Sequence, residues 1–317
     1  MRNEGPYILE WIAWHRSIGF NDILILSNDC TDGSDHLLRH LASRNLIHHA
    51  EHHPEVGEFA LNSAYRTARN HPLIKSADWV MALDADEFLV VKVGEGTVQS
   101  LINHSGEEFL GMAVHWKSFG DSGLRDWRDG MVREIYTQCA HGQHRANMRF
   151  KSIFRKPEEF GGFTSHAPHD FKGIWGGNNS WVDSNAQKLR PIQLIGKERR
   201  RATRLARIVH DAAQVNHYVV KCFESMAERR EKWETSNRDT RYDDEFLELY
   251  NNSDEEDLSA TQNTTRFTQA YKQITDDPET MRLHHATCAA YVSKLLSFSG
   301  ADPKKDARYN MHIAKSQ

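Results

Sequence analysis

Apolar and polar positions alternate along the first ninety residues in a way that predicts helices and strands in turn. Helical spacing and short apolar runs predict, in order, a helix over 6–18, a strand over 22–26, a helix over 31–44, a strand over 46–50, a helix over 58–70 and a buried strand within 79–91. This alternation predicts an α/β fold built on a doubly wound, mixed but mainly parallel sheet.

Later segments change the pattern and predict a second, mainly helical region. Apolar runs predict strands over 109–119 and 150–156, and helical spacing predicts helices over 131–141, 215–233 and 279–297. We divide the chain into a core over 1–190 and a helical C-terminal region over 191–317 that completes the site. A doubly wound sheet ordinarily opens with a strand, and we therefore expect a first strand upstream of Met1.

Composition excludes several classes of protein. The 317 residues carry a net charge of −4, which gives no electrostatic case for nucleic acid as a partner. No apolar run approaches the roughly 20 residues that span a bilayer, and charged residues interrupt any signal peptide. The four cysteines lie far apart, which predicts free thiols in a reducing cytoplasm, without a zinc motif or a disulfide framework. The basic segment 197–207 predicts a solvated helix, with a peripheral contact to anionic lipid as the alternative.

Two carboxylates at the end of the strand within 79–91 are the first candidates for chemistry. Asp84 and Asp86 are two residues apart, and in a strand such residues point to the same side. Charge at a buried strand end needs compensation, and a divalent cation shared with the phosphates of a ligand would supply it. The alternative is a turn in which the two aspartates cap backbone amides.

A polar cluster, 26–34, directly follows the strand predicted over 22–26. Its side chains, Asn28 and Asp29 among them, suit a base edge or ribose hydroxyls, and the helix N-terminus behind them favours anions. Capping of that helix by Thr31 and Asp32 explains the cluster equally simply, and on these residues alone it is the better interpretation.

These motifs together resemble a known family. Asn3-Glu4-Gly5-Pro6, the turn from Asn28-Asp29 to Gly33, and Leu83-Asp84-Ala85-Asp86-Glu87-Phe88 occur in order and at fitting distances. The set resembles family-2-like bacterial glycosyltransferases, which carry an Asp-x-Asp motif on a nucleotide-diphospho-sugar transferase (GT-A) fold. The similarity continues more weakly through 115–120, 151–155 and 216–221.

The resemblance implies roles for individual residues. It implies that a nucleotide-diphospho-sugar contacts Asn3, Glu4, Asn28, Asp29, Asp84 and Lys221. It places Mn²⁺ or Mg²⁺ on Asp84, Asp86 and His217, where the ion acts as a Lewis acid toward the leaving diphosphate. On the helix predicted over 215–233, His217 and Lys221 would share a face. The alternative for His217 is a buried helix histidine.

An inverting transfer also needs a general base for the acceptor hydroxyl. In relatives this base often follows a Gly-Gly-Phe-like turn, here Gly161-Gly162-Phe163, and the next acidic residue is Asp170. We take Asp170 as the first candidate and His166 as the second. The alternative is a loop whose histidines bind backbone or metal.

We therefore predict a cytoplasmic, metal-dependent glycosyltransferase, with a peripheral position at the inner face of the membrane as the alternative location. It would move a sugar from a nucleotide diphosphate, most simply a UDP-sugar, to a hydroxyl of a glycan or lipid-linked glycan, with inversion, in bacterial surface polysaccharide assembly. The alternatives are an inactive glycan- or nucleotide-binding module and a nucleotidyltransferase that builds a nucleotide-sugar.

Overall fold

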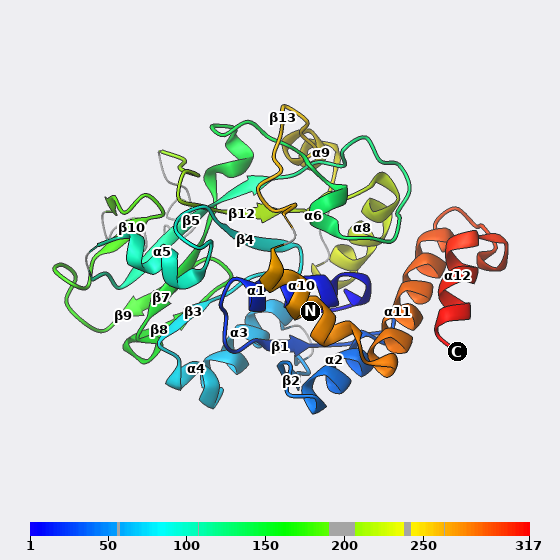
Figure 1. The fold of residues 1–317 in the computed structure, drawn as a ribbon, viewed down its shortest axis with the longest axis horizontal. Helices are drawn as coiled ribbons and strands as arrows, with labels where there is room; N and C mark the ends of the chain where they lie inside the picture. Colours follow the sequence, from blue (N-terminus) through cyan, green and yellow to red (C-terminus); the bar gives the residue numbers. More distant parts are fainter. Residues whose placement is uncertain (56–57, 107, 190–206, 238–241, 263) are drawn as a thin grey trace.

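A mixed seven-stranded sheet forms the centre of the molecule (Figure 1). The computed structural model describes residues 1–55, 58–106, 108–189, 207–237, 242–262 and 264–317. The strands of this sheet are β3 (Trp79–Met81), β4 (Glu87–Val91), β5 (Gly111–Ser118), β7 (Phe150–Arg155), β10 (Trp181–Asp183), β11 (Lys188–Leu189) and β12 (Ala213–His217). The basic segment 197–207 lies almost wholly outside the described residues.

The long strand β5 lies in the middle of this sheet, and every one of its residues is buried. On one side β5 pairs antiparallel with β7, which in turn pairs antiparallel with β3. On the other side β5 pairs in parallel with β10 along its first half and with β12 along its second half. The outer strands β11 and β4 run antiparallel to β10 and β12.

The sheet is therefore mixed, with two parallel pairings out of six. The predicted α/β class and C-terminal helices are confirmed, whereas the mainly parallel, doubly wound GT-A sheet is not. Parallel neighbours need a long crossover, usually a helix. The segment that joins β5 to β7 contains only short helical pieces, the longest being the four-residue α6 (Val132–Ile135) and η2 (Arg145–Met148), and β7 returns antiparallel.

The predicted alternation is confirmed in a separate βαβ unit. β1 (Leu24–Ser27) and β2 (His48–Glu51) pair in parallel, and α2 (Ser34–Ser43) connects them. The apolar face of α2 is fully buried through Leu37, Leu38 and Leu41. Two further helices, α3 (Ala60–Asn70) and α4 (Pro72–Ser76), lead from this unit to β3.

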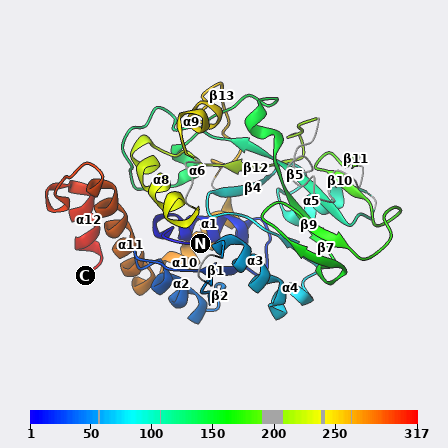
Figure 2. The same ribbon diagram turned by 180° about the vertical axis from the view of Figure 1, so that it is seen from behind.

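Helix α1 (Ile8–Ser17), preceded by the 3₁₀ turn η1 (Gly5–Tyr7), lies between β4 and α10 (Thr265–Thr275), as Figure 2 shows from behind. Two tryptophans of α1 bind the backbone of the sheet. The indole N–H of Trp14 donates to the Leu89 carbonyl at 2.8 Å, and that of Trp11 donates to the Glu87 carbonyl at 2.9 Å. Because these donors satisfy strand carbonyl groups away from water, α1 holds β4 in place.

Three of the predicted elements differ in the structure. Residues 131–141 form the single turn α6 and the strand β6 (Gln138–Cys139), and 215–233 is divided between β12 and α8 (Phe223–Asn237). The run 79–91 is likewise two strands, β3 and β4, with a turn between them. The remaining elements are α5 (Val98–His104), η3 (Pro157–Glu159), β8 (Phe160–Phe163), β9 (Pro168–Phe171), α9 (Asp244–Tyr250), β13 (Glu255–Glu256) and η5 (Pro303–Lys305).

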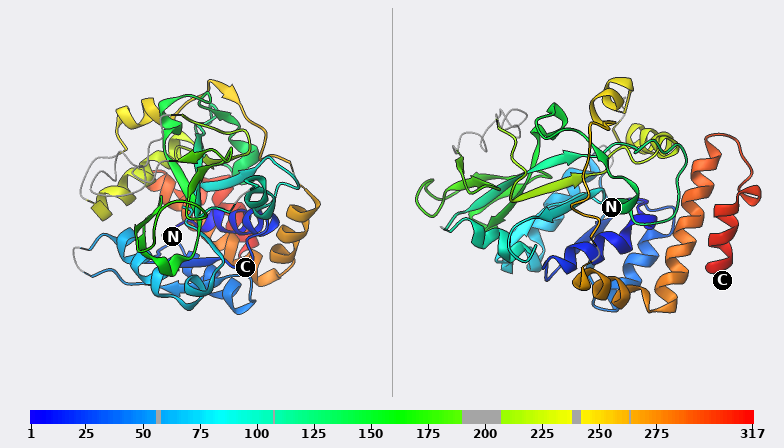
Figure 3. Two further views of the ribbon diagram at one scale, coloured as in Figure 1. Left: turned by 90° about the vertical axis from the view of Figure 1, so that its left-hand side faces the viewer. Right: turned by 45° about the horizontal axis from the view of Figure 1, so that its top comes forward.

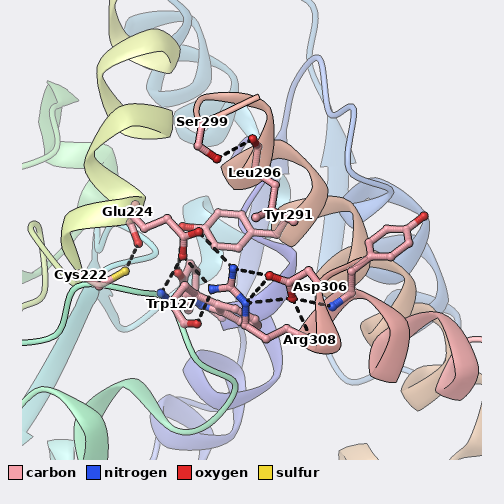
Figure 4. Close-up of polar contacts among 11 residues, drawn as sticks. Trp127, Cys222, Glu224, Tyr291, Leu296, Ser299, Asp306 and Arg308 are labelled. Atoms are coloured by element: carbon pink, nitrogen blue, oxygen red, sulfur yellow. Dashed lines mark hydrogen bonds and ion pairs between the residues drawn. The ribbon is translucent and has the colours of Figure 1, made fainter. Parts of the chain in front are cut away.

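The C-terminal helices α11 (Pro278–Ser297) and α12 (Ala307–Lys315) stand side by side at one end of the molecule (Figure 3). Arg308 of α12 donates to the Trp127 carbonyl and to the Glu224 carboxylate, both at 2.8 Å (Figure 4). These bonds tie α12 to the start of α8 and to the loop before α6. Among the described residues, no helix is both long and apolar enough to cross a membrane.

Candidate active site

A cavity of about 900 Å³ opens between β1, η1, the turn after β3, β12 and the start of α8. This volume lies in the range of small-molecule sites in proteins. Eight of the residues singled out from the sequence line it: Asn3, Glu4, Asn28, Asp84, Asp86, His166, His217 and Lys221. Asp29 and Asp170 are exposed and do not line it. The structure thus brings together most of a set that is dispersed over more than 200 residues of sequence.

Asp84 and Asp86 lie in the turn between β3 and β4, so the prediction that both belong to one strand end is wrong. The Glu87 backbone N–H donates to the Asp84 carbonyl at 3.1 Å and closes the turn. Trp11 also donates to that carbonyl, at 3.1 Å. Because of this turn the two carboxylates pair with different cations, Asp84 with Lys151 and Asp86 with Arg229.

Asp84 shares a buried lysine with Glu87. Lys151 of β7 has a fully buried side chain, and its Nζ lies 2.9 Å from Asp84 Oδ2 and 2.7 Å from Glu87 Oε2. Burial would lower the pKa of Lys151, but the two carboxylates outweigh it and raise that pKa. The pKa of Glu87 is raised because its carboxyl is fully buried, whereas Lys151 lowers the pKa of Asp84 against the effect of its desolvation.

Asp86 pairs with an arginine from α8. Arg229 Nη2 lies 2.7 Å from Asp86 Oδ2, and only 9% of the Asp86 side chain is exposed. Burial would raise the pKa of Asp86, but the charge of Arg229, with smaller contributions from His217 and Lys221, lowers it. Asp86 is therefore an anion in this site throughout the neutral pH range.

His217 ends β12 and faces the same carboxylate. Its Nε2 is 3.9 Å from Asp86 Oδ1, and the centre of its ring lies 4.1 Å from that of Trp116, with the two rings tilted by 31°. Burial lowers the pKa of His217 to about 3, so the imidazole is neutral. Its Nδ1 is buried and has no hydrogen-bond partner among the described residues. The prediction of a helix position is wrong for His217, which lies on a strand that pairs with β4 and β5.

Lys221 follows in the loop between β12 and α8, where its backbone has φ +54°, a conformation that L-residues adopt rarely. Its side chain is almost completely buried, and Nζ lies 4.3 Å from the centre of the Tyr7 ring. The predicted helical face shared with His217 is therefore wrong. The loop nevertheless brings Lys221 to the cavity, next to Asp86, whose pKa it helps to lower.

The N-terminal residues are held against the loop after β1. The Asn3 side chain accepts from the Thr31 N–H at 2.8 Å and donates to the Thr31 hydroxyl at 3.0 Å, and the Gly5 N–H donates to Asp32 at 3.2 Å. The predicted N-cap at Thr31 or Asp32 is wrong, because Gly33 is the N-cap of α2 and has no side-chain cap bond. Asp32 Oδ1 accepts from the Ser34 N–H at 2.9 Å, and Thr31 bonds Asn3 instead. Asn28 faces the cavity while its amide also donates to Asp29 at 2.9 Å.

The two candidate bases are placed differently. His166 lies in the turn between β8 and β9, half-buried at the cavity wall, and its Nδ1 is 2.9 Å from the Phe150 carbonyl. Because a carbonyl only accepts, Nδ1 carries the proton and Nε2 is free to accept one. Burial lowers the pKa of His166 to about 4. Asp170 instead bonds His169 at 2.5 Å, with a side chain that is 76% exposed.

Sequence reasoning missed Lys151 and Arg229, the two cations that form ion pairs with the aspartates. A lysine within the apolar run of β7 was the available signal for Lys151, since an isolated charge in a buried strand requires a partner. Arg229 lies in the polar stretch 228–231 of α8 and gave no such signal. Arg149, which lies over the Trp116 ring at 5.9 Å, and Tyr242 also line the cavity and were not predicted.

The donor atoms of the site fit a divalent cation in part. Asp86 and His217 present a carboxylate and a neutral imidazole nitrogen, which Mn²⁺ accepts. Among the described residues, however, Asp84, Asp86 and His217 do not bring three ligand atoms within 4.8 Å of one another. A cation at this position would need oxygen atoms from a bound ligand, as is usual for ions shared with phosphates.

The cavity thus joins aspartates, a neutral histidine and buried cations beside a βαβ unit. Comparison with known proteins gives the class as glycosyltransferase. The profile of glycosyltransferase family 92 matches residues 3–282, and the chain belongs to this family. The predicted glycosyltransferase class is confirmed. The resemblance to family-2-like bacterial enzymes and the role of the Asp-x-Asp motif are not confirmed.

A relative shows the same family in a plant. A glycosyltransferase family 92 protein of Ricinus communis is 30% identical over 129 residues. The match covers 39% of this chain and 22% of the relative, so this chain spans about a fifth of the length of the relative it matches.

Proposed function

We propose that the cavity binds a nucleotide-diphospho-sugar, most simply a UDP-sugar, and transfers its sugar to a hydroxyl of a glycan. The observation that supports this most directly is the convergence of Asp84, Asp86, His217 and Lys221 at one cavity wall in a chain of glycosyltransferase family 92. The cavity volume, about 900 Å³, is sufficient for a ligand of this size.

The cations of the site suit a diphosphate. Lys221 and Arg229 both line the cavity, and Arg229 presents a planar fork of donors that matches phosphate oxygens. In the free protein Arg229 is held by Asp86, so a diphosphate would compete with that carboxylate for the guanidinium. Asn28 at the end of β1 would take the ribose or the base, next to the chain start that Asn3 anchors.

Asp86 and His217, with Asp84, would hold a Mn²⁺ or Mg²⁺ that also contacts the diphosphate. Such an ion supplies Lewis-acid stabilisation of the leaving nucleoside diphosphate. Lys151 and Arg229 occupy one oxygen each of Asp84 and Asp86, which keeps both carboxylates ionised and correctly turned before a ligand binds. The neutral state of His217 leaves a lone pair for coordination without prior loss of a proton.

His166 would act as the general base. Its Nδ1–H is fixed on the Phe150 carbonyl, so Nε2 accepts the proton of the acceptor hydroxyl as that oxygen attacks the anomeric carbon. A single displacement of this kind inverts the anomeric configuration. The acceptor as a surface polysaccharide and the bacterial setting rest on the sequence resemblance, and the cytoplasmic location rests on the spacing of the four cysteines. All three remain predictions.

Calorimetric titration of UDP, with and without Mn²⁺, tests the proposal. We expect binding that requires Mn²⁺ and is lost in Asp86→Ala, and unchanged binding in Asp126→Asn, which replaces an exposed aspartate away from the cavity. Hydrolysis of UDP-sugars by the intact chain, measured next, distinguishes a transferase from an inactive module. UDP binding without any need for metal would contradict the proposed role of the carboxylates. Failure to bind either UDP or GDP would contradict the donor class.

A further inference from the structure

A second group of side chains of the types that bind metal ions lies away from this cavity, where α11 meets the loop before α6. Asp129, His284 and Cys288 each place one ligand atom within 4.8 Å of those of the other two. His284 and Cys288 are four residues apart in α11 and so lie on one face of the helix. None of the three lines the candidate active site.

Burial and unsatisfied polar atoms distinguish this group from an ordinary surface cluster. His284 is 7% exposed and Cys288 is completely buried, whereas the Asp129 side chain is 41% exposed. The Nδ1 of His284 is buried without a hydrogen-bond partner among the described residues. The Nε2 of the same ring faces Cys288, with 3.6 Å between this nitrogen and Sγ, so an ion would bind between these two atoms.

Two more histidines support the group from α11 and α12. His312 is fully buried, and its Nε2 lies 3.9 Å from Asp129 Oδ2 and likewise has no hydrogen-bond partner among the described residues. Its Nδ1 lies 3.0 Å from Nδ1 of His285, so one of these two nitrogens carries the shared proton. Carboxylates that bind metal ions are themselves held by outer groups, and His312 lies beside Asp129, although at 3.9 Å it is beyond hydrogen-bond distance.

We propose that Asp129, His284 and Cys288 bind a Zn²⁺ ion, with His312 orienting Asp129. One thiolate, one imidazole and one carboxylate are the donors that zinc takes at tetrahedral sites, and the thiolate disfavours Mg²⁺ and Mn²⁺. The exposed side of Asp129 leaves the fourth position to water. The ion replaces the proton of the Cys288 thiol, which is released to solvent on binding.

The neighbourhood fits a structural role for this ion. Asp129 is two residues from Trp127, whose carbonyl accepts from Arg308 and whose ring packs on Tyr291 (Figure 4). The ion would therefore connect the loop before α6 with α11 at the point where Arg308 already connects that loop with α12. This zinc site is independent of the proposed transfer reaction.

The sequence did not predict the site because its ligands come from two distant segments. The sequence predicted that all four cysteines are free thiols and form no zinc site, and the proposal departs from that prediction at Cys288. A single Cys with a His four residues earlier is common in helices, and only the fold brings Asp129 to them.

Cobalt substitution of the full-length chain tests the proposal. After treatment with a chelator, titration with Co²⁺ should produce a thiolate-to-cobalt charge-transfer band that saturates at one ion per chain and is displaced by Zn²⁺. Cys288→Ser should abolish the band, and His284→Gln should weaken Co²⁺ binding at least tenfold. Cys222→Ser, the same change at a buried cysteine of the neighbouring segment, should leave the band intact, as should Asp86→Asn in the other cavity.

Metal analysis of the purified protein, expressed without a histidine tag, provides the second measurement. We expect one zinc per chain that is lost in Cys288→Ser and retained in Cys222→Ser. His312→Gln should keep this stoichiometry and weaken the affinity about 10–100-fold. A charge-transfer band of equal intensity in Cys288→Ser, or no band in the intact chain under saturating Co²⁺, would overturn the proposal. All variants are checked for folding by circular dichroism.

Discussion

Replacement of Arg229 by methionine tests the electrostatic account of the site most directly. Arg229→Met keeps a long apolar side chain but removes the guanidinium that lies 2.7 Å from Asp86. The carboxylate then remains in a position where only 9% of it is exposed. Removal of one partner of a buried ion pair typically costs about 3–5 kcal/mol, because the other charge is left without compensation.

The protonation of Asp86 sets an upper bound on this loss of unfolding free energy. An unpaired carboxylate can take a proton instead, and from an unfolded pKa near 3.9 this costs about 4 kcal/mol at pH 7 and about 1.5 kcal/mol at pH 5. Lys221 remains close and reduces the loss. We therefore expect the free energy of unfolding of Arg229→Met to fall by about 3 kcal/mol at pH 7 and by half that or less at pH 5.

The sign of the pH effect follows from the pKa of Asp86 in each protein. In the parent protein Arg229 holds the pKa of Asp86 below its value in the unfolded chain. The ion pair therefore stabilises the folded protein fully above pH 4, and this stabilisation is lost only as the pH falls through the pKa of Asp86 in the folded state. In Arg229→Met the folded pKa is raised, so the variant takes up a proton and recovers stability relative to the parent as the pH falls toward 4.

Urea unfolding followed by tryptophan fluorescence at pH 7 and pH 5 measures both quantities. The matched control is the double variant Asp86→Asn/Arg229→Met, in which no charge is left unpaired, and it should recover most of the loss. A loss below about 1 kcal/mol at pH 7, or a loss that the double variant fails to recover, would refute the reasoning.

Three further predictions concern other ionisable groups of the protein. His166→Gln should lower the transfer rate by about 10²–10⁴-fold while UDP affinity is unchanged, and Asp170→Asn in the same assay tests the alternative base. Lys151→Met should cost about 3–5 kcal/mol in urea unfolding at pH 7, and a second change, Glu87→Gln, should recover part of it. Acidification from pH 6.5 to pH 4 should lower stability steeply, because unfolding lets buried neutral histidines take up protons, each contributing about 1.4 kcal/mol per pH unit. The raised pKa values of Glu10 and Glu87 oppose this loss of stability, because these carboxyls take up protons in the folded protein first. Urea midpoints that stay constant from pH 7 to pH 5 would contradict the prediction. The histidines with pKa values lowered to about 3 or 4 are His15, His115, His166, His210, His217 and His284.

The spacing of apolar residues was sufficient to predict the helices and strands that have a long apolar face. The helix expected over 279–297 is α11, and the βαβ unit expected over the first fifty residues is β1, α2 and β2. The short motifs in order were sufficient to gather Asn28, Asp84 and His217 at one cavity, although the sequence placed Asp84 on a strand and His217 on a helix. Strand ends are places where polar side chains can meet a ligand without loss of sheet pairing.

The partners of the carboxylates could not be predicted in the same way. Lys151 is 67 residues from Asp84, and Arg229 is 143 residues from Asp86. Long-range pairs of this kind depend on how β7 and α8 are placed, which no local pattern specifies. The turn at Asp84–Asp86 was missed for a related reason: an apolar run of thirteen residues looks like one strand until its partners, β7 for β3 and β12 for β4, are known.

The bond between Arg308 and Glu224 bears on where a truncated version of this protein should end. Glu224 is the second residue of α8, and Arg229, one and a half turns further along the same helix, reaches Asp86. The similarity to family 92 ends at residue 282, and Arg308 lies beyond it. A truncation designed on the family boundary would keep Asp84, Asp86, His217 and Arg229 but remove the anchor of the helix that carries the arginine. Such a shortened protein would retain the cavity residues, but the helix that positions Arg229 relative to Asp86 would no longer be anchored at its start.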